Sequence, residues 1–503
     1  MNNRQSVEKL AKESGIVFVG TVIGYFFRYG ILIFIARMFS AATVGIYSLG
    51  LTLTTISANI GRLGLPTATT RFTAEFRASE SHSKIRSLFR FSLVVASISA
   101  VLMALIQFGF AERWINLMSK STENGTMQIS VIRLFALTVP LSVLTNIALA
   151  ITQGYKVMKY RAIVMNFIQP FVLFLSLLIL MNFGWAEDSI WFAFVISYVF
   201  ATFFAFYFLR RFVSIFQTGE SIKRSEIVRF ALPAMLGSTL TMFVMMADVW
   251  VIRFYLGTEE AGFYYPAART SILIRTILFA FMSIFSPIVS ELVKKGDFSA
   301  LEKQFKLATK WILHLAVPSI LFFLVAGQDI LHIFGAKYAH RSLETLWLLN
   351  SGRFIAAAVG PVGMMILMSG RAKLELWNNL IATIVFFVTA AVLMDFNRSI
   401  TSVAWAVLIS RAVLNLLRAI EVRKIFGMTA YQINNWKSFF SGFVATGITY
   451  FWMQSGVFDD FKFRLISSAM LFLIVYLGTL KLCKFDDEDE IVFNACRKKM
   501  KRW

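Results

Sequence analysis

Residues 162–183 read AIVMNFIQPFVLFLSLLILMNF and contain no charged side chain. A helix of about 20 such residues is long enough to cross the hydrocarbon core of a bilayer. The whole chain has this character, since 57% of its 503 residues are hydrophobic and only 16% are charged. A soluble chain carries about 25% charged residues. The composition therefore excludes an ordinary soluble enzyme, a disordered protein and a disulfide scaffold, and it predicts a polytopic membrane protein.

Segments of this kind recur along the chain and predict fourteen membrane-spanning helices. They are residues 15–36, 43–64, 88–110, 128–150, 162–183, 189–209, 230–252, 262–285, 311–328, 345–368, 374–394, 400–420, 438–455 and 463–481. The second span is the most polar, with many Thr, Ser, Gly and Asn residues. We expect it to face protein or a water-filled cavity instead of lipid. The predicted fold class is an all-α polytopic membrane protein.

The charges predict the orientation of these spans. The chain has 50 Lys and Arg against 28 Asp and Glu, which gives a net charge of +22. If the N-terminus is cytoplasmic, nine of the Lys and Arg lie in outer connections and most of the others lie in cytoplasmic loops and tails. Such a bias sets membrane topology, so we expect both termini in the cytoplasm and no nucleic-acid partner. The basic end of the tail, residues 497–502, is expected either to rest on anionic lipid or to stay solvated.

The chain also contains an internal repeat. Arg37 precedes Val44-Gly45-Ile46-Tyr47, and Arg253 precedes Ala261-Gly262-Phe263-Tyr264 at nearly the same spacing. Each copy contains six spans, so both have the same orientation, and parallel repeats of this kind form two bundles around a substrate pathway. We predict two six-helix lobes related by pseudo-two-fold symmetry and, after them, two extra helices with a cytoplasmic tail. Their bounds are 1–228, 229–436 and 437–503.

Several short motifs resemble those of a known family. They are Leu63-Gly64-Leu65-Pro66 with Arg71 and Glu75, Phe230-Ala231-Leu232-Pro233, Leu256-Gly257, Ser286-Pro287 with Glu291, Ile333-Phe334-Gly335-Ala336-Lys337-Tyr338 and Gly370-Arg371-Ala372-Lys373. In this order, and together with the repeat, they resemble the polysaccharide exporters and lipid-linked oligosaccharide flippases of the multidrug/oligosaccharidyl-lipid/polysaccharide (MOP) superfamily. The likeness covers about residues 10–420.

The resemblance implies a bundle that opens alternately to each face of a bacterial inner membrane. It implies that the substrate is an undecaprenyl-diphosphate-linked glycan, carried from the cytoplasmic to the outer leaflet. Membrane lipids and polysaccharide assembly enzymes would be further partners.

Charged residues inside the predicted spans are strongly uneven. The arginines are Arg28, Arg62, Arg133, Arg269, Arg275, Arg353 and Arg411, whereas the clear acid is Asp248. Charge inside a span usually faces a cavity or a partner, and an excess of positive charge requires an anion. Guanidinium groups match phosphate oxygens and stay charged at any relevant pH. A diphosphate therefore fits these spans.

Five of the arginines are candidate substrate ligands: Arg28, Arg275, Arg353, Arg269 and Arg62. Arg28 shares a helix face with Gly20 and Gly24. This stripe of small residues either leaves room for a ligand or packs against another helix. Arg62 lies near the end of its span and could instead extend to the interface. Arg269 and Arg275 cannot share one narrow face, and Arg275 lies deeper.

Asp248 is the candidate ion-coupling residue. It could bind a coupling proton or cation, or pair with a cavity arginine that releases it when substrate enters. It could equally form a fixed structural pair. The sequence leaves these alternatives open.

The expected function is a transporter that flips a lipid-diphosphate-linked oligosaccharide, such as a polysaccharide or O-antigen repeat unit, by alternating access through a cationic central cavity. No enzyme activity, cofactor or metal is expected, because the sequence has no GxxxxGK[ST] loop, zinc motif or nucleophile elbow. The main alternative is a cation-coupled multidrug exporter of the same superfamily, with Asp248 in its cavity and the arginines outside. A transport-inactive scaffold for a polysaccharide assembly complex is a third.

Overall fold

The computed structural model describes residues 3–118, 125–213, 219–432 and 435–483, and every regular element in these ranges is a helix. The basic end of the tail, for which lipid contact was one expectation, lies outside the described residues. The chain divides into two compact units, Met1–Tyr265 and Pro266–Trp503. The division of the chain into lobes at residue 228 stays a prediction.

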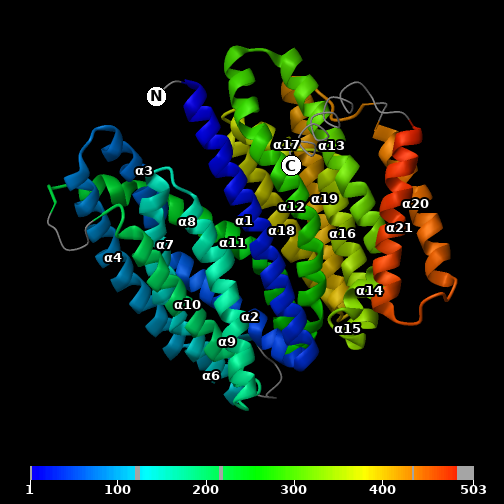
Figure 1. Cartoon of the computed structure of the whole chain (residues 1–503), viewed down its shortest axis with the longest axis horizontal. Helices are drawn as coiled ribbons and strands as arrows, with labels where there is room; N and C mark the ends of the chain where they lie inside the picture. Colours follow the sequence, from blue (N-terminus) through cyan, green and yellow to red (C-terminus); the bar gives the residue numbers. More distant parts are fainter. Residues whose placement is uncertain (1–2, 119–124, 214–218, 433–434, 484–503) are drawn as a thin grey trace. The chain divides into compact units, whose positions relative to one another are not determined.

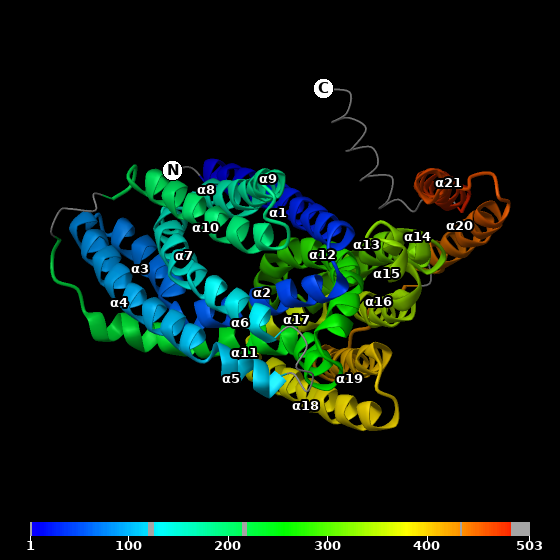
Figure 2. The ribbon, with the colours of Figure 1, turned by 90° about the horizontal axis from the view of Figure 1, so that it is seen from below.

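The first unit contains the helices that lead up to Tyr265 (Figure 1). They are α1 (Asn3–Met38), α2 (Ala41–Gly61), α3 (Leu65–Ala78), α4 (His82–Gly109), α5 (Ala111–Met118), α6 (Gly125–Ala136), α7 (Thr138–Gly154), α8 (Lys159–Ala162), the π-helix η1 (Ile163–Ile168), α9 (Gln169–Asn182), α10 (Asp188–Leu209) and α11 (Arg224–Leu256). Within this unit α7 packs against α3, α4 and α10 (Figure 2).

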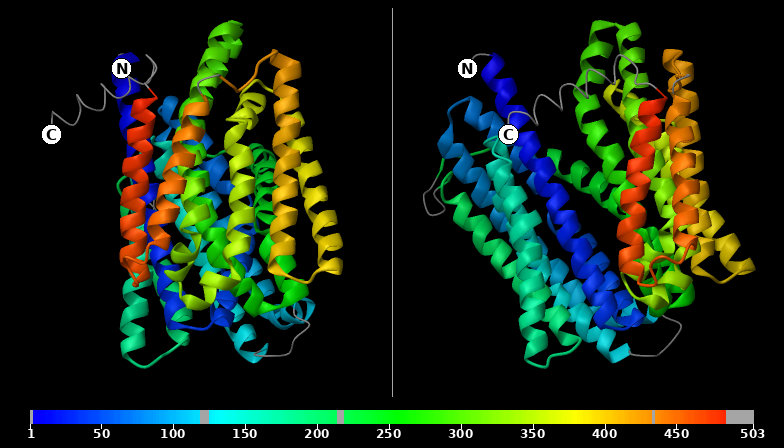
Figure 3. Two further views of the ribbon diagram at one scale, coloured as in Figure 1. Left: turned by 90° about the vertical axis from the view of Figure 1, so that its right-hand side faces the viewer. Right: turned by 45° about the vertical axis from the view of Figure 1, so that its right-hand side comes forward.

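The second unit begins inside α12 (Thr258–Lys295), which crosses the boundary between the units. Its other helices are α13 (Phe298–Val325), α14 (Gly327–His332), α15 (Ala336–Arg341), α16 (Leu343–Ala358), α17 (Val362–Met368), α18 (Ala372–Phe396), α19 (Ile400–Phe426), α20 (Trp436–Gln454) and α21 (Phe461–Leu482). The last two form a hairpin, orange and red in Figure 3, and α20 packs on α13.

Within the described residues, eleven helices are long and apolar enough to cross a membrane, or twelve if the bent pair α16–α17 is one span. The protein is thus an all-helical, multi-pass membrane protein. The predicted count of fourteen is not confirmed, because the spans 262–285 and 438–455 are not among these candidates. Residues 262–285 nevertheless lie in the long helix α12, and residues 438–454 lie in α20.

Helix α2 corresponds to the polar second span and is the one most enclosed by protein. Of its most apolar window, 78% is buried, compared with 22% for α4. Two of its buried hydroxyl groups are satisfied within the helix, since Ser48 donates to the Gly45 carbonyl at 2.8 Å and Thr52 to the Ser48 carbonyl at 2.7 Å. The expectation that this span faces protein is confirmed. Polar residues are tolerated there because packing and backbone acceptors replace lipid contact.

The two repeat glycines, Gly45 and Gly262, meet at one helix crossing in the first unit. A methyl group at Gly45 would overlap the carbonyl oxygen of Thr258 on α12, and one at Gly262 would overlap that of Ala41 on α2. Only glycine lets the two backbones approach this closely. The repeated motif therefore encodes a close crossing of α2 and α12.

Helix α11 is held to α2 and α3 by a second set of contacts. Gly64, with φ of +69°, is the N-cap residue before α3, and a methyl group there would overlap the Ala231 carbonyl of α11. Nearby, Asn59 of α2 donates to the hydroxyls of Ser238 and Thr239 at 3.0 and 2.9 Å. These contacts explain why α11 belongs to the first compact unit.

Candidate functional site

The small-residue stripe on α1 is a packing seam. A Cβ atom at Gly20 would lie 2.8 Å from Cβ of Ala162, and one at Gly24 would lie 2.7 Å from Cβ of Asn166. Both distances are shorter than side chains allow, so the two glycines press α1 against α8 and η1. This is one of the two alternatives that the sequence left open for the stripe.

Arg28 lies one turn further along the same face of α1. Its Nη2 donates to the main-chain carbonyl of Met165 at 2.7 Å, and the side chain is otherwise exposed. Met165 lies in the π-helical turn before Pro170. Proline has no N–H group, and π-turns leave backbone groups outside the regular α-helical ladder. Arg28 thus bonds a neutral acceptor and keeps its full positive charge.

Arg62 follows the last residue of α2 and is directed into the first unit. Its Nη2 donates to the hydroxyl of Ser142 on α7 at 2.9 Å, while its Nε is buried without a hydrogen-bond partner. No carboxylate among the described residues pairs with it. A buried donor without an acceptor costs about 1–3 kcal/mol, so this guanidinium is ready to accept an anionic partner.

Arg161 is a third cation, close enough to Arg62 for their charges to interact, and it is not among the arginines expected inside the spans. It lies on α8, one helical turn before Met165, and its positive charge repels that of Arg62 while burial removes it from water. The predicted span began at residue 162, so this charge was counted with the cytoplasmic loop. Because span ends are uncertain by a few residues, an arginine directly before a predicted span is also a candidate substrate ligand. We call Arg28, Arg62 and Arg161 the arginine cluster.

Other arginines of the first unit are used in packing against aromatic rings. Arg71 covers the ring of Phe230 at 4.4 Å, and Arg77 donates to the Tyr155 carbonyl at 2.8 Å. Tyr155 lies in the loop before α8, where burial raises the pKa of its phenol and the charge of Arg77 opposes that shift. These contacts are structural, so they set the arginine cluster apart.

Asp248 lies on α11, half-buried. Its carboxylate accepts a hydrogen bond from the Tyr264 hydroxyl at 2.8 Å and another from the backbone N–H of Val249 at 2.9 Å. In the part of the chain described, it forms no ion pair with an arginine. The structure therefore brings Asp248 together with the tyrosine of the repeated motif, not with any of the candidate arginines.

Arg253 corrects a further expectation. The sequence placed it in an outer connection, but α11 continues to Leu256 and Arg253 is only 1% exposed. Its Nη2 donates to Oε1 of Gln128 at 2.6 Å, and its Nε and Nη1 are buried without hydrogen-bond partners. Arg253 thus lies in a helix and not in a loop, because apolar content alone set the predicted end of the span, whereas the last turn of α11 is buried by contacts with α5 and by Gln128 of α6. The outer side of the membrane for this turn stays a prediction.

The candidate arginines of the second unit, Arg269 and Arg275 on α12 and Arg353 on α16, are half-buried, and each interacts with other groups. Arg411 packs against Gly352, where an added Cβ would lie 3.1 Å from its Cδ. This contact packs α19 against α16.

Two further arginines of this unit are fixed by acids. Arg464 donates to both oxygens of the buried Asp329 at 2.6 and 2.8 Å, and Arg418 makes a two-point contact with Glu375. Among the side chains described, no group of three or more His, Cys, Asp or Glu residues could hold a metal ion.

Several solved structures share this fold. The lipid II flippase MurJ in its inward closed conformation is 16% identical, with a TM-score of 0.69 over 94% of this chain and 98% of that chain. An inward-facing multidrug resistance transporter of the MATE family, from the MOP superfamily, is 16% identical, with a TM-score of 0.70 over 80% of this chain and 94% of that one.

A third structure is a MOP superfamily transporter from Pyrococcus furiosus, described with the words "reverse polarity of binding pocket suggests different function". It is 15% identical, with a TM-score of 0.60 over 83% of this chain and 96% of that one. At such identities the likeness shows the fold alone.

A comparison with curated proteins finds no match to this sequence. A family profile described as "Polysaccharide biosynthesis protein" matches residues 10–293, which is more than half of the chain. The protein therefore belongs to the polysaccharide biosynthesis protein family and has the fold of MOP superfamily transporters.

Proposed function

We propose that this protein flips a lipid-diphosphate-linked oligosaccharide from the cytoplasmic to the outer leaflet by alternating access through a cationic cavity. The observation that carries the proposal is the arginine cluster. Arg28 bonds the Met165 carbonyl on η1, and Arg161 lies on α8 one turn earlier, where its charge repels that of Arg62. The described hydrogen bonds of Arg28 and Arg62 go to a carbonyl and a hydroxyl, both neutral. A protein that kept such charges only for stability would be expected to pair them with carboxylates.

Transfer of a diphosphate across the membrane requires cationic groups that bind it on the way. Moving one ion from water into a medium like hydrocarbon costs about 20 kcal/mol in the idealised limit, so a bare diphosphate cannot cross unaided. Guanidinium groups bind phosphate oxygens through two parallel hydrogen bonds, which strengthen where water is scarce. A cluster with unsatisfied donors can therefore accept the diphosphate without first breaking an ion pair.

The residues of the cluster act as binding groups and not as catalysts. The hydrogen bond from Arg28 to Met165 is a single bond to a neutral oxygen, and a phosphate oxygen is the stronger acceptor. The buried Nε of Arg62 offers a donor that no described group uses. We place Arg269, Arg275 and Arg353 as further phosphate ligands in the second unit, and Asp248, with Tyr264, as the ion-coupling group.

Family and fold support this assignment at a coarser level. The family description names polysaccharide biosynthesis, and one structural neighbour is a lipid II flippase. We accordingly propose the bacterial inner membrane as the location, with both termini in the cytoplasm. A polysaccharide or O-antigen repeat unit on undecaprenyl diphosphate would be the substrate, and polysaccharide assembly enzymes would be partners.

Deletion of the protein tests the proposal, with lipid-linked sugars as the readout. The glycan should accumulate on its lipid carrier in the cytoplasmic leaflet, where a membrane-impermeant enzyme added outside cannot reach it. Restoring the wild-type chain should return the glycan to the outer leaflet. Unchanged access from outside in the deletion strain would contradict the proposal.

A cation-coupled multidrug exporter is the second candidate, favoured by the half-buried Asp248 and by the MATE-like fold. Such an exporter would use Asp248 to bind a cationic substrate. Drug sensitivity that rises in Asp248→Asn cells while the lipid-linked glycan is still flipped would favour this candidate.

A further inference from the structure

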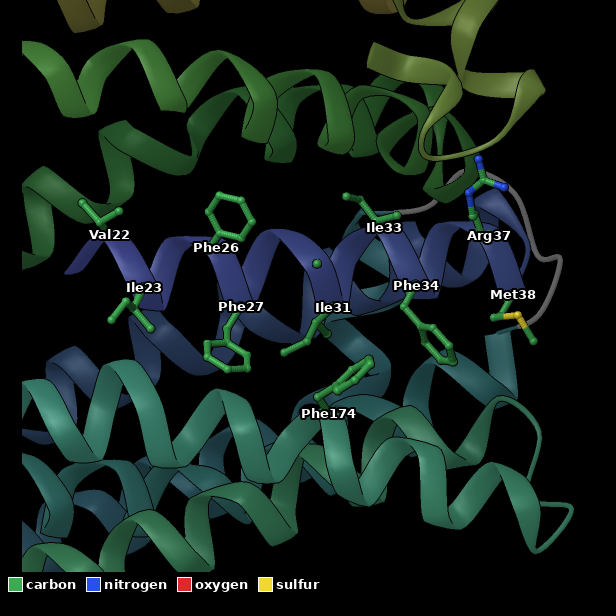
Figure 4. A pocket seen from close by; sticks show the side chains of 11 residues that line it. Val22, Ile23, Phe26, Phe27, Ile31, Ile33, Phe34, Arg37, Met38 and Phe174 are labelled. Atoms are coloured by element: carbon green, nitrogen blue, oxygen red, sulfur yellow. The ribbon is translucent and has the colours of Figure 1, made fainter. Parts of the chain in front are cut away.

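The exposed face of α1 carries an apolar groove of about 640 Å³ (Figure 4). Val22, Phe26 and Ile33 line one side, and Phe27, Phe34 and Phe174 line the other, the last of these from α9. Every residue that lines the groove belongs to the first unit. Phe26 is 82% exposed and Val22 45%, so these rings and methyl groups are open to whatever fills the groove.

The floor of the groove is Gly30. A Cβ atom added there would find no other atom within 4 Å, so the space above this residue is empty. From Val22 to Met38 the groove follows the helix for about 24 Å, since an α-helix rises about 1.5 Å per residue. That length exceeds half of the ~30 Å hydrocarbon core. The groove can therefore hold an extended hydrocarbon chain along one leaflet.

One end of the groove is cationic. Arg37 lines it in the last turn of α1, at the end where the predicted topology places the outer surface. Arg28 faces the other way, because its position on the helix is about 160° around from Gly30 at 100° per residue. Helix α1 thus separates the arginine cluster from the groove, and Arg37 is the charge on the groove side.

We propose that this groove is the outer-leaflet site for the prenyl chain of the flipped lipid, with Arg37 binding its diphosphate. The inference rests on the proposed function and deepens it. An apolar channel that ends at a guanidinium complements a molecule with a long hydrocarbon chain and a phosphate at one end. A prenyl diphosphate places its whole negative charge at that end. The site would hold the product after the head group has crossed.

Photo-crosslinking of the purified full-length protein tests this proposal. The probe is farnesyl diphosphate with a photoreactive group on its terminal isoprene, and the protein is in vesicles of a zwitterionic phospholipid. We expect labelled peptides from α1 and from the part of α9 around Phe174. Gly30→Leu should fill the groove and reduce this labelling about tenfold, as the loss of a few buried methylene contacts predicts.

Gly447→Leu on α20 is the matched control, because an added side chain there also meets open space, and its labelling should equal that of the wild type. Arg37→Ala should lower labelling by the diphosphate probe about tenfold and leave labelling by the uncharged prenyl alcohol unchanged. Retention of both variants in the membrane, with unchanged melting temperatures, would show that they fold.

Three other outcomes would overturn the proposal. Labelling confined to α20 and α21 would place the chain elsewhere and leave the proposed function intact. Equal competition by an anionic phospholipid would make the groove an ordinary lipid site. If neither the diphosphate probe nor the prenyl alcohol labels any helix, and the deletion strain still exposes its glycan outside, the proposed function fails as well.

Discussion

Arginines of the two compact units have different hydrogen-bond acceptors. In the first unit, Arg28 and Arg62 donate to a carbonyl and a hydroxyl, and Arg161 lies beside Arg62 as a like charge. In the second unit, Arg418 and Arg464 are held by Glu375 and Asp329 through two bonds each. A carboxylate neutralises an arginine and fixes its position, whereas a neutral oxygen fixes the position and leaves the charge. Arg28 and Arg62 of the first unit therefore keep positive charge that no carboxylate neutralises, which is what the proposed function needs, while these two pairs of the second unit are neutralised in place.

Removing two charges of the arginine cluster should reduce the flipping rate more than any other change considered. In Arg28→Ala/Arg62→Ala, we expect flipping of the lipid-linked glycan to fall 100-fold or more, because each charge-assisted hydrogen bond contributes about 1.5–3 kcal/mol. The rate is measured in vesicles that contain the purified protein. The melting temperature should change little, since no ion pair is broken. Wild-type flipping in this variant would remove the distinction between the two units.

Breaking an ion pair of the second unit should lower the stability of the protein and leave its flipping rate unchanged. Glu375→Ala leaves the guanidinium of Arg418 without its partner, and because this pair is only partly buried we expect a cost of up to about 3 kcal/mol, the low end of the range for a fully buried pair. We expect a marked fall in the free energy of unfolding, measured by chemical denaturation in detergent, with flipping per folded molecule retained. The double variant Glu375→Leu/Arg418→Leu should recover much of the stability, because no buried charge is left alone. Full stability of the single variant would show that this pair is not structural.

A substitution at Gly24 can move Arg28 without removing its charge. Gly24→Ala would place a Cβ atom 2.7 Å from Cβ of Asn166, so α1 must move away from η1 and carry Arg28 with it. Overpacking of this kind costs about 1–3 kcal/mol, and we expect flipping to fall about tenfold although no charge is lost. Gly109→Ala at the end of α4, where the added atom also meets open space, is the control in the same unit. Equal activity of the two variants would mean that the position of Arg28 does not matter.

The smallest change in flipping rate is expected for Arg133, which lies outside the cluster. Arg133 is exposed and lies over the ring of Phe108 at 5.2 Å. Surface substitutions of this type usually change stability by less than about 0.5 kcal/mol. Arg133→Ala should therefore flip the glycan at close to the wild-type rate and should melt at an unchanged temperature. A large loss of activity would show that Arg133, which is not among the proposed phosphate ligands, also serves transport.

Most of the fold could be predicted from the sequence, because bilayer thickness and backbone hydrogen bonding leave few alternatives to apolar helices. The polar second span was expected to face protein, and it does. The count of spans was less certain. Of the predicted spans, residues 262–285 and 438–454 lie in α12 and α20, which the criterion of length and apolar content does not select.

The site was harder to predict, because burial and pairing depend on residues far apart in the sequence. Glu375 and Arg418 are on different helices, and only their packing turns two charges into a pair. The burial of Arg161 and Arg253 likewise results from helices that pack on them, and a hydropathy pattern cannot register that. Arg28 could be singled out because its depth in α1 is local information. Its acceptor, the Met165 carbonyl of a π-turn, could not.

A structure determined with a prenyl diphosphate bound before transfer, in a conformation open to the cytoplasm, tests the central claim most directly, because the site at Arg37 is proposed for the product in the outer leaflet. The account predicts phosphate oxygens within about 3 Å of at least two members of the arginine cluster, with Arg28 released from the Met165 carbonyl. Phosphate groups bound elsewhere, with Arg28 still on Met165 and Arg62 still on Ser142, would contradict it.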